Sequence, residues 1–238
     1  MIFSIEYIAL LLVTLAIGGA AQWYIKSTFK RYSNVRAQNG LTGAQVAERI
    51  LQANNILATV AETERVDARN NVVVTAVAGD LTDHYDPRKG IVGLSKPVYG
   101  VASISANAVA AHEVGHALQN ADRYVWGEIR TAIVPVVNFG SSLSFPLILA
   151  GIFLNFFQLF WIGIAFYGLA VAFQIVTLPV ELNASNRALV QLRETGILAE
   201  GEVPGARRVL TAAALTYVAA ALTSIMYLLY FIGLGSRD

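Results

Sequence analysis

Residues 131–180 read TAIVPVVNFGSSLSFPLILAGIFLNFFQLFWIGIAFYGLAVAFQIVTLPV, and none of these 50 residues is charged. A helix needs about 20 apolar residues to cross a bilayer, so this run is long enough for two helices. Asn155 and Gln158 are polar residues near its middle and favour a hairpin there. We therefore predict transmembrane helices over 131–153 and 157–178.

Two further runs without charge lie near the ends of the chain. The first, 7–25, has 19 residues, and the second, 209–236, has 28. Each is long enough for one crossing, which predicts helices over 4–25 and 209–234. A Lys/Arg cluster follows the first run and no basic residue precedes it, which favours a retained anchor over a signal peptide. The chain has 14% charged residues, against roughly a quarter in soluble domains. We predict a mainly α integral membrane protein with four transmembrane helices.

Lysine and arginine residues near the helix ends predict the orientation in the membrane. They border the segments 26–130 and 179–208, whereas the opposite helix ends have only Arg237. We expect both segments to be cytoplasmic and both termini to be outside, in a multi-pass protein of a bacterial-type inner or plasma membrane. The bordering residues are Lys26, Lys30, Arg31, Arg36, Arg123, Arg130, Arg187, Arg193, Arg207 and Arg208.

The polar part of the chain has the pattern of a small α+β domain. Apolar residues at helical spacing after the N-cap Thr42 indicate an amphipathic helix, and Ser103 or Ser105 is placed to cap another. Short β-branched runs indicate strands, and DLTDHYDPRKG has the Asp, Pro and Gly of a loop. We predict helices over 41–56, 103–121 and 183–195, strands over 71–79 and 91–95, and a loop over 80–90.

The segment NAVAAHEVGHALQN, residues 107–120, holds two of the three histidines of the chain. On a helix, His112 and His116 lie one turn apart on one face and can both bind one zinc ion at about 2.0–2.1 Å. Glu113 is placed to take a proton from a water on the metal. Gly115 allows another element to approach this helix closely. The alternative is that both histidines are ordinary surface or core residues of a helix.

A catalytic zinc ion takes three protein ligands and leaves the fourth position for water. Glu181 is the leading candidate for the third ligand, because it is the first charge after the 50-residue apolar run. A carboxylate there is costly unless it is paired or metal-bound. His84 is the competing ligand, and both residues have plain alternatives, a charge at the membrane boundary and a loop histidine. The chain has no cysteine, so no thiolate ligand is available.

Three motifs in order, LTDHYDPRKGIVGLS, AAHEVGHALQ and LPVELNASNRAL, resemble those of the bacterial membrane zinc metallopeptidases of the YugP type. The resemblance covers nearly the whole chain and implies a zinc-dependent peptidase with His112 and His116 as ligands and Glu113 as catalytic base. The membrane gluzincin peptidases, which include the CAAX prenyl peptidases, are similar and place an Asp four residues after their Glu ligand. Ser185 occupies that position here, so Asn183 or Ser185 is expected to replace the Asp as an outer contact of the site.

The resulting prediction is a small α+β zincin-like cytoplasmic domain carried by four transmembrane helices. We predict a zinc metallopeptidase, an endopeptidase rather than an exopeptidase, with zinc-bound water activated by Glu113. The alternative is a non-catalytic, zinc-stabilised membrane scaffold or assembly factor. The predicted organisation is a first transmembrane helix (1–25), a zinc-protease domain (26–130), a transmembrane hairpin (131–178), a cytoplasmic segment with the third ligand (179–208), and a last helix with the C-terminus (209–238).

The remaining expectations concern substrate and surroundings. Tyr85 or His84 is a candidate donor to the oxyanion of the reaction. The run IVGLS, residues 91–95, is either an edge strand that pairs with an extended peptide or an ordinary buried strand. We expect a peptide or a membrane protein as substrate, a lipid bilayer as surroundings, and no nucleic acid partner.

Overall fold

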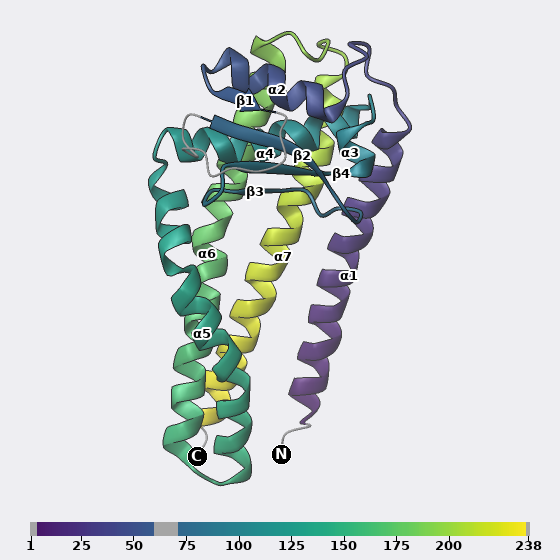
Figure 1. The fold of residues 1–238 in the computed structure, drawn as a ribbon. Coiled ribbons are helices and arrows are strands. Elements are labelled where there is room, and N and C mark those ends of the chain that lie inside the picture. Colours follow the sequence, from purple (N-terminus) through teal and green to yellow (C-terminus); the bar gives the residue numbers. More distant parts are fainter. Residues whose placement is uncertain (1–3, 60–70, 237–238) are drawn as a thin grey trace. The chain divides into compact units, whose positions relative to one another are not determined.

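The computed structural model describes residues 4–59 and 71–236 of the chain and is mostly helical (Figure 1). It divides into two compact units. The first unit, which we call the membrane unit, consists of Met1–Gln22, Glu128–Pro179 and Leu215–Asp238. The second, the site unit, consists of Trp23–Gly127 and Val180–Ala214.

Among the residues that the structure describes, four helices are long and apolar enough to cross a membrane, which agrees with the predicted number. Their most apolar 18-residue windows have mean hydropathies of 1.7 to 2.0. Compared with the prediction, α1 and α6 are longer at their C-terminal ends, α5 is longer at its N-terminal end, and α7 is longer at both ends. The helices are α1 (Ile5–Ser33), α5 (Val125–Phe153), α6 (Phe157–Glu194) and α7 (Val203–Gly235).

Close contacts between backbones hold α5 against α6 in the membrane unit. A Cβ atom added at Gly151 would lie 2.5 Å from the Phe160 nitrogen, and one at Gly163 would lie 2.7 Å from the Ile148 nitrogen. Small residues allow such packing where there is no hydrophobic force between helices in lipid. The turn between the two helices contains Asn155 with φ of 49°, in the region where asparagine is the tolerated non-glycine residue.

The site unit contains a four-stranded sheet with the strand order β1-β2-β4-β3. Strand β2 is parallel to β1 and to β4, and β3 is antiparallel to β4. Residues 80–90 were expected to form a loop, and this is wrong for three of them, since β3 lies within this segment and pairs with β4. The strands are β1 (Leu57–Thr59), β2 (Asn71–Val77), β3 (His84–Asp86) and β4 (Ile91–Ser95).

Helices α2 (Gly43–Ala53), α3 (Lys96–Tyr99) and α4 (Ile104–Ala121) complete the site unit. The Thr42 side chain accepts a hydrogen bond from the Gln45 nitrogen in a capping box, which confirms Thr42 as N-cap of α2. Ser103 caps α4, so the choice between Ser103 and Ser105 is settled for Ser103. The apolar sides of α2 and α4 share one core with the buried valines and leucine of β2 and β4.

Helix α6 is continuous from Phe157 to Glu194. The prediction of a separate surface helix over 183–195 is therefore wrong, since these residues are the last turns of α6. Pro179 lies inside the helix, where it removes one backbone hydrogen bond. The helix continues past Pro179 because many helical residues on each side keep their backbone hydrogen bonds.

Candidate metal centre

Helix α4 presents both histidines of the HEVGH segment on one face. The ring centroids of His112 and His116 lie 4.8 Å apart, and the rings are nearly perpendicular at 82°. Neighbouring alanines on α4 are buried and leave the helix slender. The two imidazoles thus point toward the same region, as the four-residue spacing predicts.

Gly115 brings α6 against this helix. A Cβ atom added at Gly115 would lie 2.6 Å from the carbonyl oxygen of Ala184, closer than real side-chain atoms approach. Ala184 is three residues beyond Glu181 on α6, so the glycine contact allows Glu181 to reach the face of α4 that carries the histidines. The prediction that Gly115 permits a close approach is confirmed.

Glu181 is 2% exposed and faces both imidazoles. Its Oε2 atom lies 3.3 Å from Nε2 of His112 and 3.5 Å from Nε2 of His116. Two ligands bound at about 2.0–2.1 Å to a tetrahedral zinc ion lie about 3.3–3.4 Å apart, so both separations fit a shared ion. The candidate ligand atoms of these three residues all lie within 4.8 Å of one another.

The outward nitrogens of the two histidines have hydrogen-bond partners. His112 Nδ1 lies 3.2 Å from the hydroxyl oxygen of Ser185, and His116 Nδ1 lies 3.0 Å from Oε1 of Gln119. Metal-bound histidines usually use their second nitrogen in this way, which fixes the ring. The structure places Ser185 directly against a histidine, whereas Asn183 bonds to Gln119, at 3.0 Å.

Gln119 was missed in the sequence, although it lies three residues after His116 and therefore on the same side of α4. The only available signal was this spacing, which does not distinguish a contact to the ring from a solvent-facing amide. The decisive partners of Gln119 come from α6, and their positions are not visible in the sequence of α4.

The charge arrangement of the centre favours a cation. A neutral imidazole nitrogen without hydrogen is an acceptor, as is an ionised carboxylate. Two acceptors at 3.3 to 3.5 Å in a buried place repel each other unless a proton or metal ion lies between them. Two histidines and one carboxylate form a donor set that zinc prefers in catalytic sites.

Glu113 follows His112 on α4 and is 7% exposed. It belongs to the same turn of the helix as the two histidines but is not one of the three residues whose ligand atoms cluster. A carboxylate beside a metal site, outside the set of ligands, is suited to proton transfer.

Tyr85 lies near the C-terminal end of α4. Its hydroxyl oxygen accepts a hydrogen bond of 3.0 Å from Asn120, which is four residues beyond His116. Burial raises the pKa of Tyr85 to about 12, with a smaller upward contribution from Asp86 and an opposing one from Asn120. The phenol is therefore neutral throughout the physiological range.

His84 is exposed and is not one of the clustered ligands within residues 4–59 and 71–236. Its Nδ1 atom lies 2.9 Å from the Thr82 carbonyl oxygen, which only accepts, so this nitrogen carries the hydrogen. Its ring covers Gly93, where an added Cβ would lie 2.8 Å from the ring. The register pairs Tyr85 with Val92 of the core and His84 with Gly93, so the two side chains point to opposite faces of the sheet.

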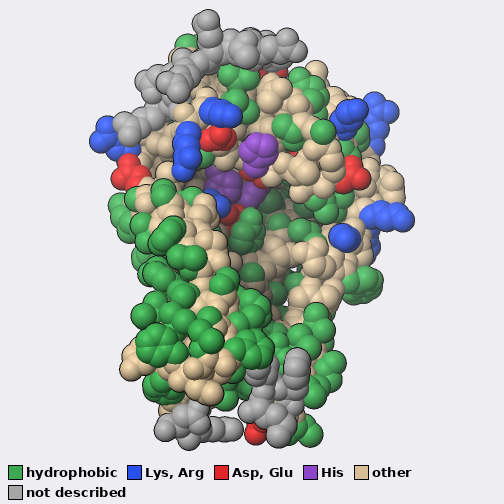
Figure 2. All heavy atoms as spheres, turned by 60° about the horizontal axis from the view of Figure 1, so that its bottom comes forward, with side chains coloured by type: hydrophobic (Ala, Val, Ile, Leu, Met, Phe, Trp, Pro, Cys, Tyr) green, Lys and Arg blue, Asp and Glu red, His purple; other side chains and the backbone are tan. Residues whose placement is uncertain are grey.

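Figure 2 shows histidine side chains in a hollow of the surface, with lysine, arginine and acidic side chains around it. Hydrophobic side chains cover most of the visible surface of the apolar helices.

Comparison with known proteins assigns the class of protein that these features define, a membrane zinc metallopeptidase. A family model described as "Putative neutral zinc metallopeptidase" matches residues 7–235, and the chain belongs to this family. The chain is also 45% identical over 234 residues to "Putative membrane protease YugP" of Bacillus subtilis (strain 168), a match that covers 98% of each chain. The resemblance to the YugP type is confirmed. No solved structure matches the chain.

Proposed function

We propose that this protein is a zinc endopeptidase that hydrolyses peptides or membrane proteins at the cytoplasmic face of the membrane. The observation that carries the proposal is the group formed by His112, His116 and the buried Glu181, with Glu113 beside it. In this proposal the three grouped residues hold the ion and Glu113 performs the proton transfer.

The division of roles follows from the chemistry of each side chain. His112, His116 and Glu181 would hold zinc, which when bound lowers the pKa of a water molecule and polarises the substrate carbonyl. Glu113 takes a proton from the attacking water as its oxygen bonds to the carbonyl carbon. As the C–N bond breaks, Glu113 passes this proton to the leaving amine.

Tyr85 is a better candidate than His84 for donating to the oxyanion. A neutral phenol is able to donate its hydrogen, and the Tyr85 hydroxyl lies 3.0 Å from the Asn120 side chain, four residues beyond His116 on α4. Neutral His84 carries its hydrogen on Nδ1, where the Thr82 carbonyl oxygen accepts it. The Nε2 atom of His84 would then donate only if the ring became positively charged.

The sheet supports a peptide substrate at a different strand from the one considered in the sequence. Strand β4, the run IVGLS, pairs with β2 on one side and β3 on the other, so it is an internal strand and not an edge. Strand β3 ends the sheet within the described residues. An extended peptide that pairs with β3 would run beside the strand that carries Tyr85.

The number of ligands favours catalysis over a purely structural zinc site. Closed structural sites hold zinc with four protein ligands, whereas catalytic sites use three. The group found in residues 4–59 and 71–236 has three members, and His84 is not added to it. A structural zinc site needs its ligands but does not need a carboxylate such as Glu113 between the two histidines.

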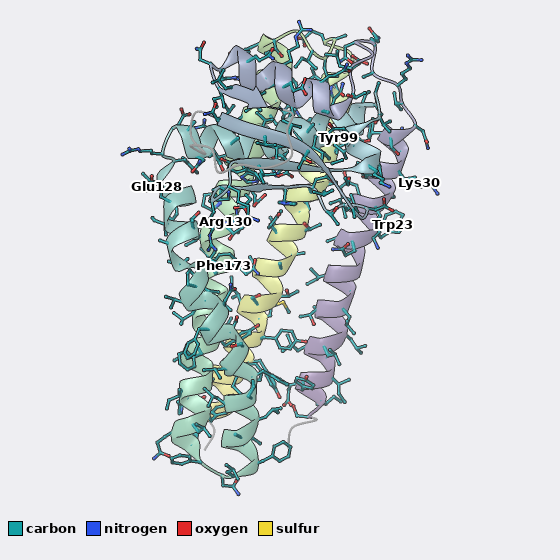
Figure 3. All side chains as sticks on the ribbon, in the orientation of Figure 1. Trp23, Lys30, Tyr99, Glu128, Arg130 and Phe173 are labelled. Atoms are coloured by element: carbon teal, nitrogen blue, oxygen red, sulfur yellow. The ribbon has the colours of Figure 1, made fainter. Side chains whose placement is uncertain are left out.

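The cytoplasmic orientation rests on basic residues and aromatic side chains at the helix ends. On α1, the exposed Trp23 is followed by Lys30 about two turns later, and Glu128 and Arg130 lie in the first two turns of α5 (Figure 3). Tryptophan is common at membrane interfaces, and basic residues mark the cytoplasmic side. Because the chain has no cysteine, Ser27→Cys and Gln158→Cys each introduce a single exposed thiol. In intact spheroplasts an impermeant maleimide should label only the Gln158→Cys variant, and the reverse pattern would refute the orientation.

The test of the catalytic proposal compares wild type with Glu113→Gln, purified in detergent and loaded with zinc. Zinc content is measured by mass spectrometry and cleavage with fluorescently labelled casein and a quenched peptide library. We expect equal zinc in both proteins and a rate for Glu113→Gln lower by a factor of about 100 to 10,000. Equal cleavage by both proteins would show that Glu113 is not the catalytic base. Cleavage that does not depend on zinc would show that the protein is not a metallopeptidase.

A further inference from the structure

Gln119 connects the candidate metal centre to the cytoplasmic part of α6. The side chain is 3% exposed and bridges α4 and α6. Its Nε2 atom donates to the Val180 carbonyl oxygen at 2.7 Å and to Asn183 Oδ1 at 3.0 Å, while its Oε1 atom lies 3.0 Å from His116 Nδ1.

The orientation of the Gln119 amide follows from its partners. The main-chain carbonyl of Val180 can only accept, so the atom facing it must be the amide nitrogen. The oxygen of the same amide is then the atom that faces His116. An inverted amide would bring two oxygens within 2.7 Å of each other and is excluded on this ground.

This orientation determines which nitrogen of His116 carries the hydrogen. The Gln119 oxygen only accepts, so His116 Nδ1 must donate to it. A neutral imidazole has one hydrogen, and Nε2 is then left with its lone pair, 3.5 Å from Glu181 Oε2. That is the form of histidine that binds a metal through Nε2.

The second acceptor of the Gln119 amide nitrogen, Asn183 Oδ1, is itself held in place. Asn183 Oδ1 also accepts from Arg187 Nε at 2.9 Å, and the Arg187 guanidinium pairs with Asp122 at the end of α4. The amide of Gln119 is thus held by a series of hydrogen bonds that begins and ends on α4.

His112 has a different kind of partner. The Ser185 hydroxyl at 3.2 Å from His112 Nδ1 can either donate or accept, so it does not select a tautomer. The two histidines therefore differ: one has a partner that dictates the hydrogen position, and the other has a partner that adapts to it.

We propose that Gln119 is a positioning residue that holds His116 in the tautomer and ring orientation required for zinc binding. The inference rests on the proposed function, since it assumes that His116 is a zinc ligand. Gln119 acts before the metal binds, so its effect is present in the zinc-free protein.

The first measurement uses zinc-free wild type with ¹⁵N-labelled histidine, extracted in detergent. With three histidines in the chain, the signals can be assigned with one substitution each. We expect the nitrogen shifts of His116 to show hydrogen on Nδ1, and a signal with hydrogen on Nε2 would overturn the proposal. This measurement needs no variant of Gln119 and no activity.

The second measurement compares the zinc affinity of Gln119→Met, Gln119→Glu and Ser185→Ala with wild type, by competition with a coloured chelator. Loss of an outer partner of a metal-bound histidine lowers affinity by about 10–100-fold. In Gln119→Met we expect this loss of zinc affinity and a mixture of His116 tautomers. Gln119→Glu keeps an acceptor, so its zinc affinity should recover in part. Ser185→Ala should change the His116 signal little.

The outcomes separate this inference from the proposed function. If wild type binds zinc, Glu181→Ala does not, and Gln119→Met matches wild type in affinity and His116 signal, only the positioning role of Gln119 is wrong. If wild type binds no zinc, the proposed function fails. A wild-type affinity in Gln119→Glu together with an altered His116 tautomer would also overturn the positioning role.

Discussion

Glu202 and Glu181 are both buried glutamates of the site unit, and they differ in what faces them. Glu202 is 7% exposed, and its two oxygens accept from the backbone nitrogens of Gln38 at 2.9 Å and Ala199 at 3.1 Å. Glu181 is 2% exposed and faces ring nitrogens of two histidines. A backbone N–H always carries its hydrogen, whereas a neutral imidazole nitrogen can be a bare acceptor.

The partners of a buried carboxylate distinguish a structural carboxylate from a metal-binding one. The surroundings of Glu202 are complete, because permanent donors stabilise its charge and join the segment before α2 to the start of α7. The two imidazole nitrogens that face Glu181 stabilise its charge when a proton or a metal ion lies between them and the carboxylate. Burial alone does not separate the two residues, but the chemistry of their partners does.

The largest expected effect is that of removing the carboxylate of Glu181. Glu181→Ala should lower zinc affinity by at least about 100-fold, because loss of a ligand exceeds the 10–100-fold effect of losing an outer partner. Zinc content and cleavage are measured together, with His84→Ala as the control that should keep both. Normal zinc binding by Glu181→Ala, with loss in His84→Ala, would show that the third ligand is His84.

The next effect concerns the contact that brings Glu181 to the histidines. Gly115→Ala adds a methyl group 2.6 Å from the Ala184 carbonyl oxygen. Overpacking of this kind destabilises by about 1–3 kcal/mol and should also weaken zinc binding, because α6 must move away from α4. Gly100→Ala is the control, since an added Cβ there meets no atom within 4 Å. Denaturant unfolding and chelator competition measure the two effects, and equal behaviour of both variants would contradict this account.

A smaller effect is expected at the other glutamate. Glu202→Gln keeps one acceptor but turns an amide group toward a backbone N–H, which should lower the free energy of unfolding by about 1 kcal/mol. Zinc content per folded chain should not change. A loss of zinc in this variant would mean that the two glutamates are not as different as their partners indicate.

The smallest effect concerns Tyr85, whose pKa is raised to about 12. The unfolded chain releases this proton near pH 10, so the folded state binds more protons between pH 10 and 12, and its stability falls as pH rises through this window. Tyr85→Phe should remove this part of the decline, on the order of 1 kcal/mol. Unfolding at a series of alkaline pH values measures it, and identical declines in both proteins would refute the shift.

Much of the centre was predictable, because its parts obey local rules. The four-residue spacing of His112 and His116 places both on one face of any helix, and the Thr42 cap follows from the residues around it. Glu181 was singled out as the first charge after a long apolar run. That it faces both imidazoles depends on the approach at Gly115, for which the sequence offered only the absence of a side chain.

The parts that were missed depend on contacts between distant segments. Strand β3 has three residues beside Asp and Pro, and only its pairing with β4 makes it a strand. The last turns of α6 were separated from the membrane helix because Pro179 usually marks a boundary. Gln119 gains its role from Val180 and Asn183, which are about sixty residues away in the chain.

The continuity of α6 has a practical consequence for the isolation of the candidate metal centre. Glu181 lies on the same continuous helix, α6, as an apolar segment long enough to cross a membrane. A fragment that ends at Gly127 would lack Glu181, and a second fragment that begins at Val180 would cut α6 one residue before Glu181. Biochemical experiments on this protein therefore require the full-length chain, extracted from the membrane.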